Sequence, residues 1–335
     1  MTASRLIERL LQTLPVLFGI SVIVFLMMTL TPGDPVEIML ADSRATAEQA
    51  AQLRRELGLD LPLYERFLVF LGNALTGDFG ISFFHRRPVI DVILERLPAT
   101  VELTLAAMVV ALLVAIPLGV AAAVNRDRWL DRALSALSLF GVSLPGFWFG
   151  ILLILLFSVT LGLLPVGGRT AFDLEVTRIT GFLLIDTLLA GRPDAFGAAL
   201  RHLALPAITL GLPTAALLAR VVRSSMAEVL TSDYVLFAEA KGLPRRRVLL
   251  RHALKNALIP VVTVAAIETG SLLGGNMIVE TVFGWPGLGR LVVESIFARN
   301  YPLVQAAVLL YAVTYVALNF MADLAYTALN PKVRL

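Results

Sequence analysis

The sequence predicts an all-α polytopic membrane protein with six transmembrane helices. Of its 335 residues, 58% are hydrophobic and 16% are charged, and the mean hydropathy is +0.82. A soluble domain averages about 45–50% apolar and about 25% charged residues, so this chain has too few polar side chains to cover a water-facing surface. A helix needs about 20 apolar residues to cross the bilayer core. Six stretches qualify, at 10–30, 99–124, 133–161, 203–224, 256–280 and 303–326.

The first stretch has one feature of a secretory signal peptide, because Arg5 and Arg9 precede its apolar run. The run is longer than the apolar region of a typical signal peptide, and the following MTLTPGDP offers no small-x-small cleavage site. We therefore expect residues 1–30 to stay in the protein as an N-terminal transmembrane helix.

The distribution of charge predicts the orientation. With the N-terminus inside, the inner pieces are 1–9, 125–132, 220–255 and 327–335. They hold 15 Lys and Arg residues against six Asp and Glu, whereas the longer outer pieces hold 13 basic and 15 acidic residues. Short, basic inner loops are what the positive-inside rule requires. Both termini are therefore expected in the cytoplasm, and the pI of about 9.4 reflects topology rather than nucleic-acid binding.

The spans divide the chain into four expected regions. These are an N-terminal transmembrane helix (1–30), a periplasmic helical segment (31–98), a five-helix core (99–326) containing a cytoplasmic loop (225–255), and a cytoplasmic tail (327–335).

The outer segments have helical patterns of their own. Residues 45–75 show helical spacing that Gly58 and Pro62 divide into two short helices. Segment 281–302 contains Gly-Trp-Pro-Gly, a turn signal, followed by a short amphipathic helix. Such an outer cap could be a lid on the bundle or a docking face for an external partner, and composition alone does not decide between them.

Several kinds of chemistry are disfavoured. The chain has no cysteine, which excludes disulfides, thiolate metal sites and cysteine nucleophiles. His85, His202 and His252 are far apart and have neither metal-binding spacing nor an evident serine partner. We expect no catalytic, cofactor or metal-binding residues, which leaves an intramembrane enzyme as a minor alternative.

The inner segment FAEAKGLPRRRVLLRHALKNALIP (237–260) predicts two short helices at an angle. Ser232 or Asp233 can cap a first helix over about 233–241, because short oxygen-bearing side chains satisfy its unpaired N–H groups. Gly242 suits the left-handed residue that ends such a helix, and Pro244 suits the start of the next.

The second helix is expected to be amphipathic. Arg247, Arg251 and Lys255 recur every four residues and form a basic stripe. The opposite side is expected to hold Leu249, Leu250, Ala253 and Leu254.

The first helix is a candidate docking element. Ala238 and Ala240, beside Phe237 and Gly242, would let the backbone or groove of another protein approach closely. The alternative is a basic helix lying on anionic lipid headgroups. Because the first helix has no positive charge except Lys241 at its end, lipid attraction does not account for it, and protein docking is favoured.

Four acidic residues fall within or at the ends of the spans, where a charge is costly unless it faces a cavity or a partner. Glu102 and Glu280 near the outer ends, and Asp323 near the inner end, are expected to reach headgroup water. Glu268 is deeper. It is expected either to line a pathway or gate, or to hydrogen-bond a neighbouring helix.

The 237–260 segment resembles the cytoplasmic coupling loop of permease subunits in ATP-binding-cassette importers, and most closely the dipeptide/oligopeptide/nickel branch. Ala238, Gly242 and Leu254 match the general loop pattern. The pattern's glutamate and proline are absent, since Leu236 and Lys255 occupy those positions. Further strings that resemble this branch are TPGDP (31–35), LGLDLPLYERF (57–67), LTGDFGISF (75–83), RLPATVELTL (96–105), SLPGFWFGILL (143–153), LPVGG (164–168), LLGGNMIVETVFGWPGLGRL (272–291) and the terminal NPKVRL.

The resemblance implies one permease of a bacterial inner-membrane importer. A second homologous permease would complete the pathway, two cytoplasmic ATPases would receive the coupling helices, and an extracytoplasmic binding protein would deliver the substrate. This chain has no GxxxxGK[ST] motif, so partner subunits would hydrolyse the ATP.

The resemblance also implies residue roles. The expected coupling residues are Phe237, Ala238, Glu239, Ala240, Lys241, Gly242, Leu243 and Leu254. Apart from the resemblance, the depth of Glu268 in its span and the small-xxx-small spacing of the glycines predict a pathway or gate, with the candidates Glu268, Gly270, Gly274, Gly275 and Asn276. The glycines favour close packing against the second permease, with a gate hinge as the alternative. Expected cargo is a peptide. Nickel chelates, glutathione, sugars and an ATP-independent transporter or channel remain alternatives.

Overall fold

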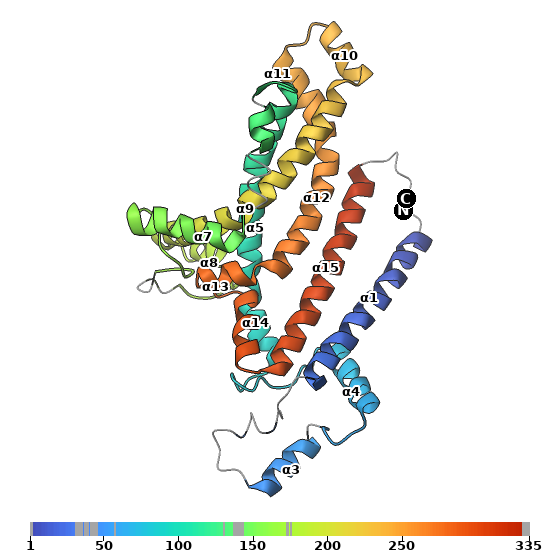
Figure 1. The fold of residues 1–335 in the computed structure, drawn as a ribbon, viewed down its shortest axis with the longest axis vertical. Helices are drawn as coiled ribbons and strands as arrows, with labels where there is room; N and C mark the ends of the chain where they lie inside the picture. The colour runs from blue at the N-terminus through green and yellow to red at the C-terminus, as the bar shows by residue number, and fades with distance from the viewer. Residues whose placement is uncertain are drawn as a thin grey trace. The chain divides into compact units, whose positions relative to one another are not determined.

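The computed structural model describes residues 3–30, 36, 40, 46–56, 58–129, 131–136, 144–171, 174 and 176–329. Across these residues the chain is built from helices joined by turns, with one isolated bridge between Ile81 and Pro88 (Figure 1). This confirms the predicted all-α class. The chain forms two compact units, one mainly of 98–289 and 317–335, the other of 2–97 and 290–316.

Five helices in the described part are long and apolar enough to cross a membrane. They are α1 (Ala3–Leu30), α5 (Val89–Val124), α9 (Pro193–Leu230), the continuous run of α11 (Arg245–Arg247), η2 (Val248–Ala253) and α12 (Leu254–Gly275), and α15 (Tyr301–Leu329). Residues 137–143 of the expected third span lie outside the described residues. The described parts of that span are residues 133–136, which are helical, and the stretch that contains α7 (Gly146–Leu153) and η1 (Ile154–Thr160), which is apolar but short.

Two long helices begin earlier than the hydropathy predicts. Helix α5 starts at Val89 and passes through Pro98, and α9 starts at Pro193 and passes through Pro206 and Pro213. Prolines are tolerated inside such helices where neighbouring groups satisfy the carbonyls that they leave unpaired.

The expected fifth span, 256–280, is wrong at both ends. The helix enters through Arg245, and α12 ends at Gly275 because Asn276 leaves the helical conformation, with φ −81° and ψ 2°. The short helix α13 (Met277–Val282) follows the break.

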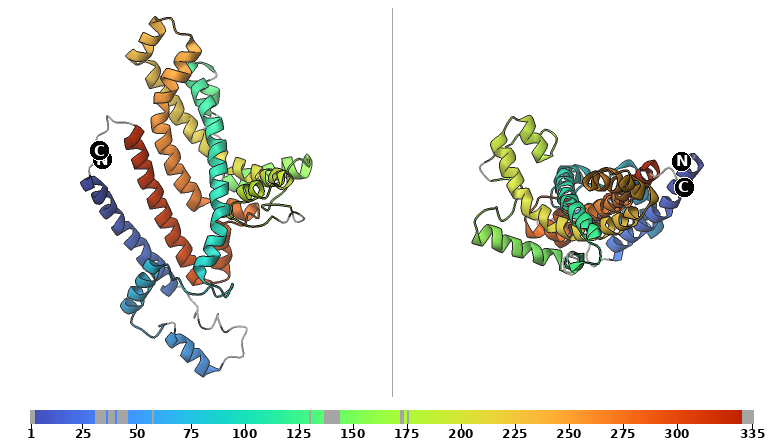
Figure 2. Two further views of the ribbon diagram at one scale, coloured as in Figure 1. Left: turned by 180° about the vertical axis from the view of Figure 1, so that it is seen from behind. Right: turned by 90° about the horizontal axis from the view of Figure 1, so that it is seen from above.

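The first unit is built around α5, α9 and α12, which run side by side (Figures 1 and 2). Glycines let α5 and α9 approach closely. A Cβ on Gly119 would lie 2.7 Å from the carbonyl oxygen of Ala219, and one on Gly211 would lie 2.7 Å from that of Ala107. Small residues at helix crossings are the usual solution in membranes, where hydrocarbon supplies no hydrophobic force between helices.

The other end of this unit gathers α7, α8 (Leu183–Leu189) and α13 around two buried aromatic residues, Phe283 and Trp285. The Gly168 N–H donates to the carbonyl of Phe283 at 2.8 Å, and the indole N–H of Trp285 donates to the carbonyl of Ala99 at 2.8 Å. The predicted Gly-Trp-Pro-Gly turn is therefore held tightly inside the unit.

The second unit contains α1, α3 (Ala47–Glu56), α4 (Leu63–Thr76), most of α14 (Leu288–Phe297) and the first half of α15. The two short helices predicted within 45–75 are confirmed as α3 and α4. Gly58 adopts a φ of +63° between them, and Pro62 immediately precedes α4. Phe67 of α4 packs edge-on against Phe18 and Phe25 of α1, at centroid distances of 5.9 and 5.3 Å.

Candidate functional site

The predicted elbow is present at the end of the α9 and α12 pair. Helix α10 (Asp233–Ala240) follows α9 and lies at the end of the first unit remote from α13 (Figures 1 and 2). Gly242 has a φ of +76°, and its N–H donates to the carbonyl of Glu239 at 2.9 Å. The left-handed helix end predicted at Gly242 is therefore present.

The predicted side-chain cap of α10 is absent. Ser232 precedes the helix, but its hydroxyl donates to the carbonyl of Val229 in the preceding turn, and no side-chain cap hydrogen bond forms. The Ser232 carbonyl instead accepts the N–H groups of Val235 and Leu236, at 3.0 and 3.1 Å. Helix α10 is therefore held by backbone bonds and by packing.

One side of α10 packs inward. Val235 and Ala238 are buried in the same core cluster as Val248 of η2 and Val222 of α9. Ala238 is only 6% exposed, so its methyl group packs into the core of this chain and does not contribute to the exposed side of α10.

The other side of α10 faces outward. Phe237 is 61% exposed, and Tyr234 and Leu236 are also exposed. The ammonium of Lys241 lies 4.5 Å from the centroid of the Phe237 ring, a cation–π contact that covers part of the ring. Glu239 and Ala240 are exposed as well, and Leu243 is half-buried. We call this surface, residues 234, 236, 237 and 239–241, the elbow face.

The second arm of the elbow contains a π-helical turn. Arg247, Arg251 and Lys255 are exposed as the basic stripe predicts. Ala253 is buried and Leu254 half-buried, whereas Leu250 is 50% exposed. The expected place of Leu250 on the apolar side is therefore wrong, because the π turn in η2 shifts the helical register, and Val248 takes the buried position.

Sequence reasoning missed an ion pair near the elbow. Asp131, in the predicted inner loop, is buried and accepts two hydrogen bonds from Arg223 of α9. These hydrogen bonds outweigh the effect of burial and lower the pKa of Asp131 from 3.8 to about 2. The available signal was the presence of two acidic residues, Asp127 and Asp131, in a loop that also holds three arginines.

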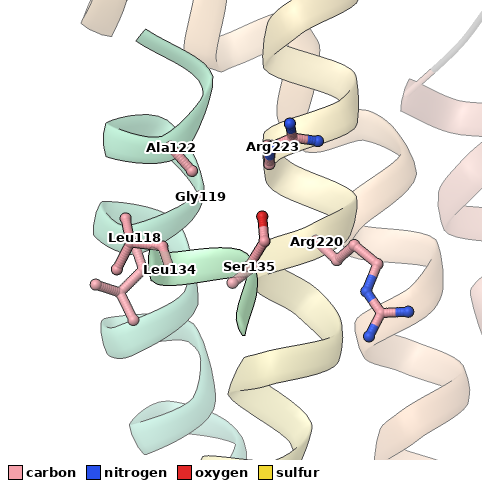
Figure 3. Close-up of a pocket in the computed structure, with 8 residues that line it drawn as sticks. Leu118, Gly119, Ala122, Leu134, Ser135, Arg220 and Arg223 are labelled. Atoms are coloured by element: carbon pink, nitrogen blue, oxygen red, sulfur yellow. The ribbon is translucent and has the colours of Figure 1, made fainter. Parts of the chain in front are cut away.

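A small pocket of about 280 Å³ lies beside this ion pair. Figure 3 shows Arg220 and Arg223 on α9, with the guanidinium of Arg220 directed away from Leu118 and Leu134, and Ser135 on the short segment of residues 131–136. The chain continues from this pocket into residues outside the description.

Glu102 does not reach headgroup water, contrary to the sequence expectation. It is 7% exposed and accepts hydrogen bonds from Arg169, at 3.1 Å from Nε and 2.6 Å from Nη2. Its other oxygen accepts the N–H of Leu184 at 2.8 Å. A buried carboxylate requires such partners, and this one ties α5 to α8 and to the segment that precedes α8.

Glu280 is also buried, and the expectation of headgroup water is wrong here too. Its side chain is fully enclosed, and Thr100 of α5 donates its hydroxyl to Oε1 at 2.7 Å. The same Thr100 oxygen accepts the N–H of Leu288 at 2.7 Å. The carboxylate packs directly against Gly287, where a Cβ would collide with it.

The predicted pathway residues all lie along α12 and its broken end, but they do not form one cluster. Glu268 is half-buried, Gly270 is buried, and a Cβ on Gly274 would meet no atom within 4 Å. Asn276 is 2% exposed, and its amide donates to the hydroxyl of Thr104 at 3.2 Å. About two helical turns, roughly 12 Å, separate Glu268 from Asn276.

Two other predicted positions are only partly described. Gly275 ends α12, and Asp323 lies within α15, but the surroundings of both side chains lie outside the description. In the part of the chain that was searched, His, Asp and Glu form no group of three that could hold a metal ion.

Comparison with known families shows which family the chain belongs to. Residues 115–335 match the family described as binding-protein-dependent transport system inner membrane component. Residues 3–104 match its N-terminal counterpart. The chain belongs to this family. The permease is therefore a multi-pass inner-membrane protein, in agreement with its long apolar helices.

Individual relatives cover nearly the whole permease. It is 44% identical over 331 residues to the di/tripeptide transport system permease protein DppB of Pseudomonas aeruginosa strain UCBPP-PA14, covering 99% of this chain and 98% of that one. It is 43% identical over 332 residues to the dipeptide transport system permease protein DppB of Escherichia coli K12, covering 98% of each. It is 42% identical over 328 residues to the glutathione transport system permease protein GsiC of the same strain, again covering 98% of each.

A solved structure has the same fold. A chain of the MetNI methionine ABC transporter, in inward-facing conformations, matches with a TM-score of 0.50 and 19% identity, covering 69% of the permease and 93% of that chain. The similarity concerns the helical arrangement alone.

Proposed function

We propose that the permease forms half of the translocation pathway of an ATP-driven importer for dipeptides and other short peptides. A second homologous permease forms the other half, two cytoplasmic ATPases drive the cycle, and an extracytoplasmic binding protein delivers the substrate. The names of the 44% and 43% identical relatives support a peptide substrate.

The elbow carries the proposal for ATP coupling. Its buried side, through Val235 and Ala238, is packed into the core that contains α9 and α12, so a force on α10 is transmitted to two of the long helices. Its elbow face offers an exposed aromatic ring, Phe237, beside the positive charge of Lys241. A large apolar side chain left exposed at the end of a helix pair is typical of a docking site.

The proposed topology places both termini and the elbow in the cytoplasm, with residues 133–161 as the third of six spans. The basic stripe of Arg247, Arg251 and Lys255, exposed in the structure, supports this orientation.

Single cysteines test orientation and docking together, because the sequence contains no cysteine of its own. Ala240→Cys places a thiol on the elbow face, and Phe84→Cys places one on an exposed outer loop as the matched control. In intact cells a membrane-impermeant maleimide should label the thiol at 84 but not the thiol at 240. In membranes that contain the ATPase, a short bifunctional cross-linker should join residue 240, and not residue 84, to the ATPase.

Labelling of residue 240 from outside would contradict the proposed topology. The absence of any ATPase cross-link from residue 240 would contradict the docking role even if the topology held.

Transport of glutathione is the second candidate, supported by the 42% identical relative. Both substrates are peptides with a free ammonium group, so uptake assays with radiolabelled dialanine and glutathione in the reconstituted importer distinguish them. A secondary transporter or a channel would move substrate without ATP. Uptake that persists when ATP is replaced by a non-hydrolysable analogue would support that alternative.

Glu268 is proposed as a pathway or gate residue. It lies in the membrane-spanning part of α12, is half-buried, and makes no hydrogen bond or ion pair within the described chain. A carboxyl group at that depth normally serves a partner or a solute. Glu268→Gln should slow uptake while leaving assembly with the ATPase intact, and Glu294→Gln, at an exposed side chain of α14, serves as the control. Unchanged uptake kinetics would remove Glu268 from the pathway.

A further inference from the structure

A second cavity, of about 350 Å³, lies in the other unit and is lined by residues of α1 and of the first half of α15. Its walls are largely apolar and include Met27 and Met28 of α1 and Val304 and Val308 of α15. The volume falls at the lower end of the range of roughly 300–1,000 Å³ found for sites that hold small ligands.

Polar groups are gathered at one end of this cavity. Arg299 ends the turn between α14 and α15, it is exposed, and its guanidinium has no hydrogen-bond or ion-pair partner within the described residues. The hydroxyl of Tyr301 is buried and also lacks a partner in that part of the chain. A buried hydroxyl is almost always hydrogen-bonded, so the Tyr301 hydroxyl is suited to donate to an acceptor of a ligand at this end.

The turn that carries Arg299 is held rigidly. Asn300 is buried, donates to the hydroxyl of Ser82 at 2.6 Å, and accepts the N–H of Phe83 at 3.2 Å. Arg299 itself has a φ of +52°, a conformation that a glycine would adopt more easily. The presence of an arginine at such a position is most simply explained if its side chain has a binding role.

We propose that this cavity binds a membrane phospholipid, with the phosphate held by Arg299 and the Tyr301 hydroxyl and one acyl chain lying along the two methionines. Both groups are hydrogen-bond donors, and guanidinium is the side chain best suited to a phosphate. The cavity is flanked by exposed apolar side chains, with Met27 at 62% and Ile296 at 55%, which suit contact with acyl chains. Flexible methionines adapt readily to such a chain.

The location agrees with a lipid rather than a soluble ligand. Both walls are apolar helices long enough to span the membrane, and the charge distribution of the sequence places residues 299–301 at the outer membrane surface. The occupant is therefore a phospholipid of the outer leaflet of the inner membrane. This site is separate from the elbow and does not depend on the transported substrate.

The test uses the full chain reconstituted in vesicles that contain phosphatidylglycerol with a photoreactive diazirine on one acyl chain. After illumination, mass spectrometry should locate the lipid on peptides containing residues 24–28 and 304–308. Diacylglycerol with the same photoreactive chain lacks the phosphate. It should label these peptides about tenfold less, because charge-assisted hydrogen bonds to the headgroup are lost.

Two variants and one control locate the binding groups. Arg299→Gln should reduce labelling by phosphatidylglycerol about tenfold but leave labelling by diacylglycerol unchanged. Val304→Trp, which fills the cavity without altering charge, should reduce labelling by both. Arg87→Gln, an exposed arginine paired with Glu95, is the matched control and should change neither.

Equal labelling by the two lipids, or full labelling of the Arg299→Gln protein, would overturn the proposal. A second experiment places a photoreactive amino acid at position 308 in the assembled importer. If it cross-links to the second permease and not to lipid, the proposal is overturned, because the cavity is then a subunit interface.

Discussion

The guanidinium of Arg223 on α9 donates two hydrogen bonds to the carboxylate of Asp131, with distances of 2.5 Å from Nε to Oδ1 and 2.7 Å from Nη2 to Oδ2. The N–H of Asp127 donates a third bond to Oδ2 at 3.0 Å. Asp131 follows α5, and Arg223 lies two turns before the end of α9. This pair therefore fixes the loop that follows α5 to the helix that leads into the elbow.

Removing one partner of this pair should destabilise the permease. Asp131→Asn and Arg223→Gln should each cost about 2–3 kcal/mol, because each leaves a partly buried polar group without its counterpart. The double variant should lose less free energy of unfolding than the two single variants lose together. Thermal unfolding of the wild type, the two single variants and the double variant in detergent can measure this. Fully additive losses would show that the two side chains are not coupled.

The same pair predicts a pH dependence. Because folding lowers the pKa of Asp131 from 3.8 to about 2, its stabilising contribution is fully present above about pH 4 and is lost as the pH falls toward 2. The unfolding temperature of the wild-type protein should fall more steeply across this window than that of Asp131→Asn. Parallel curves for the two proteins would contradict the assignment.

Gly242 tests the geometry of the elbow. A Cβ at this position would meet no atom within 4 Å, so any effect of substitution comes from the left-handed backbone alone. Gly242→Val should destabilise the turn by more than about 1 kcal/mol and reduce both co-purification of the ATPase and uptake of substrate. Gly242→Asn is the matched control, because asparagine tolerates this conformation, and it should retain most activity. Similar activity in the two variants would show that the turn conformation is not required.

Phe237 and Ala238 should behave differently despite being neighbours. Phe237→Ala removes an exposed ring, so the permease should fold normally but bind the ATPase more weakly, which affinity co-purification can measure. Ala238→Arg forces a charged side chain into the core and should lower the yield of folded protein. Phe84→Ala, an exposed outer aromatic residue, is the control and should leave ATPase binding unchanged. Normal ATPase binding by Phe237→Ala would remove its ring from the interface.

The contact between Gly287 and Glu280 predicts a steric effect. Gly287→Ala places a methyl group against the buried carboxylate and should cost about 1–3 kcal/mol, as overpacking does in well-packed cores. Gly72→Ala in α4 meets no atom within 4 Å and should be neutral or slightly stabilising. Thermal unfolding in detergent compares the stability of the Gly287→Ala and Gly72→Ala proteins. Equal stability would indicate that the turn between α13 and α14 adjusts to the added methyl group without cost.

The long helices and the elbow could be predicted because their causes are local. A run of about 20 apolar residues has no stable place except the bilayer, and its length sets the helix. Gly242 could be predicted to end α10 because glycine adopts a positive φ with little strain. The break at Asn276 was not predicted, since the apolar pattern continues through it to Val282.

Sequence alone therefore determined an all-helical membrane protein with a two-helix elbow, because hydropathy and turn preferences act over a few neighbouring residues. Only the tertiary structure decided which polar groups are buried and with whom. Glu102 and Arg169 are 67 residues apart, and Thr100 and Glu280 are 180 apart, so no local pattern could pair them. The same holds for Ala238, which is buried in a core cluster shared with residues of other helices, such as Val222 of α9. A charge is stable in the membrane only when a partner is brought to it, and that partner is supplied by the packing of distant helices.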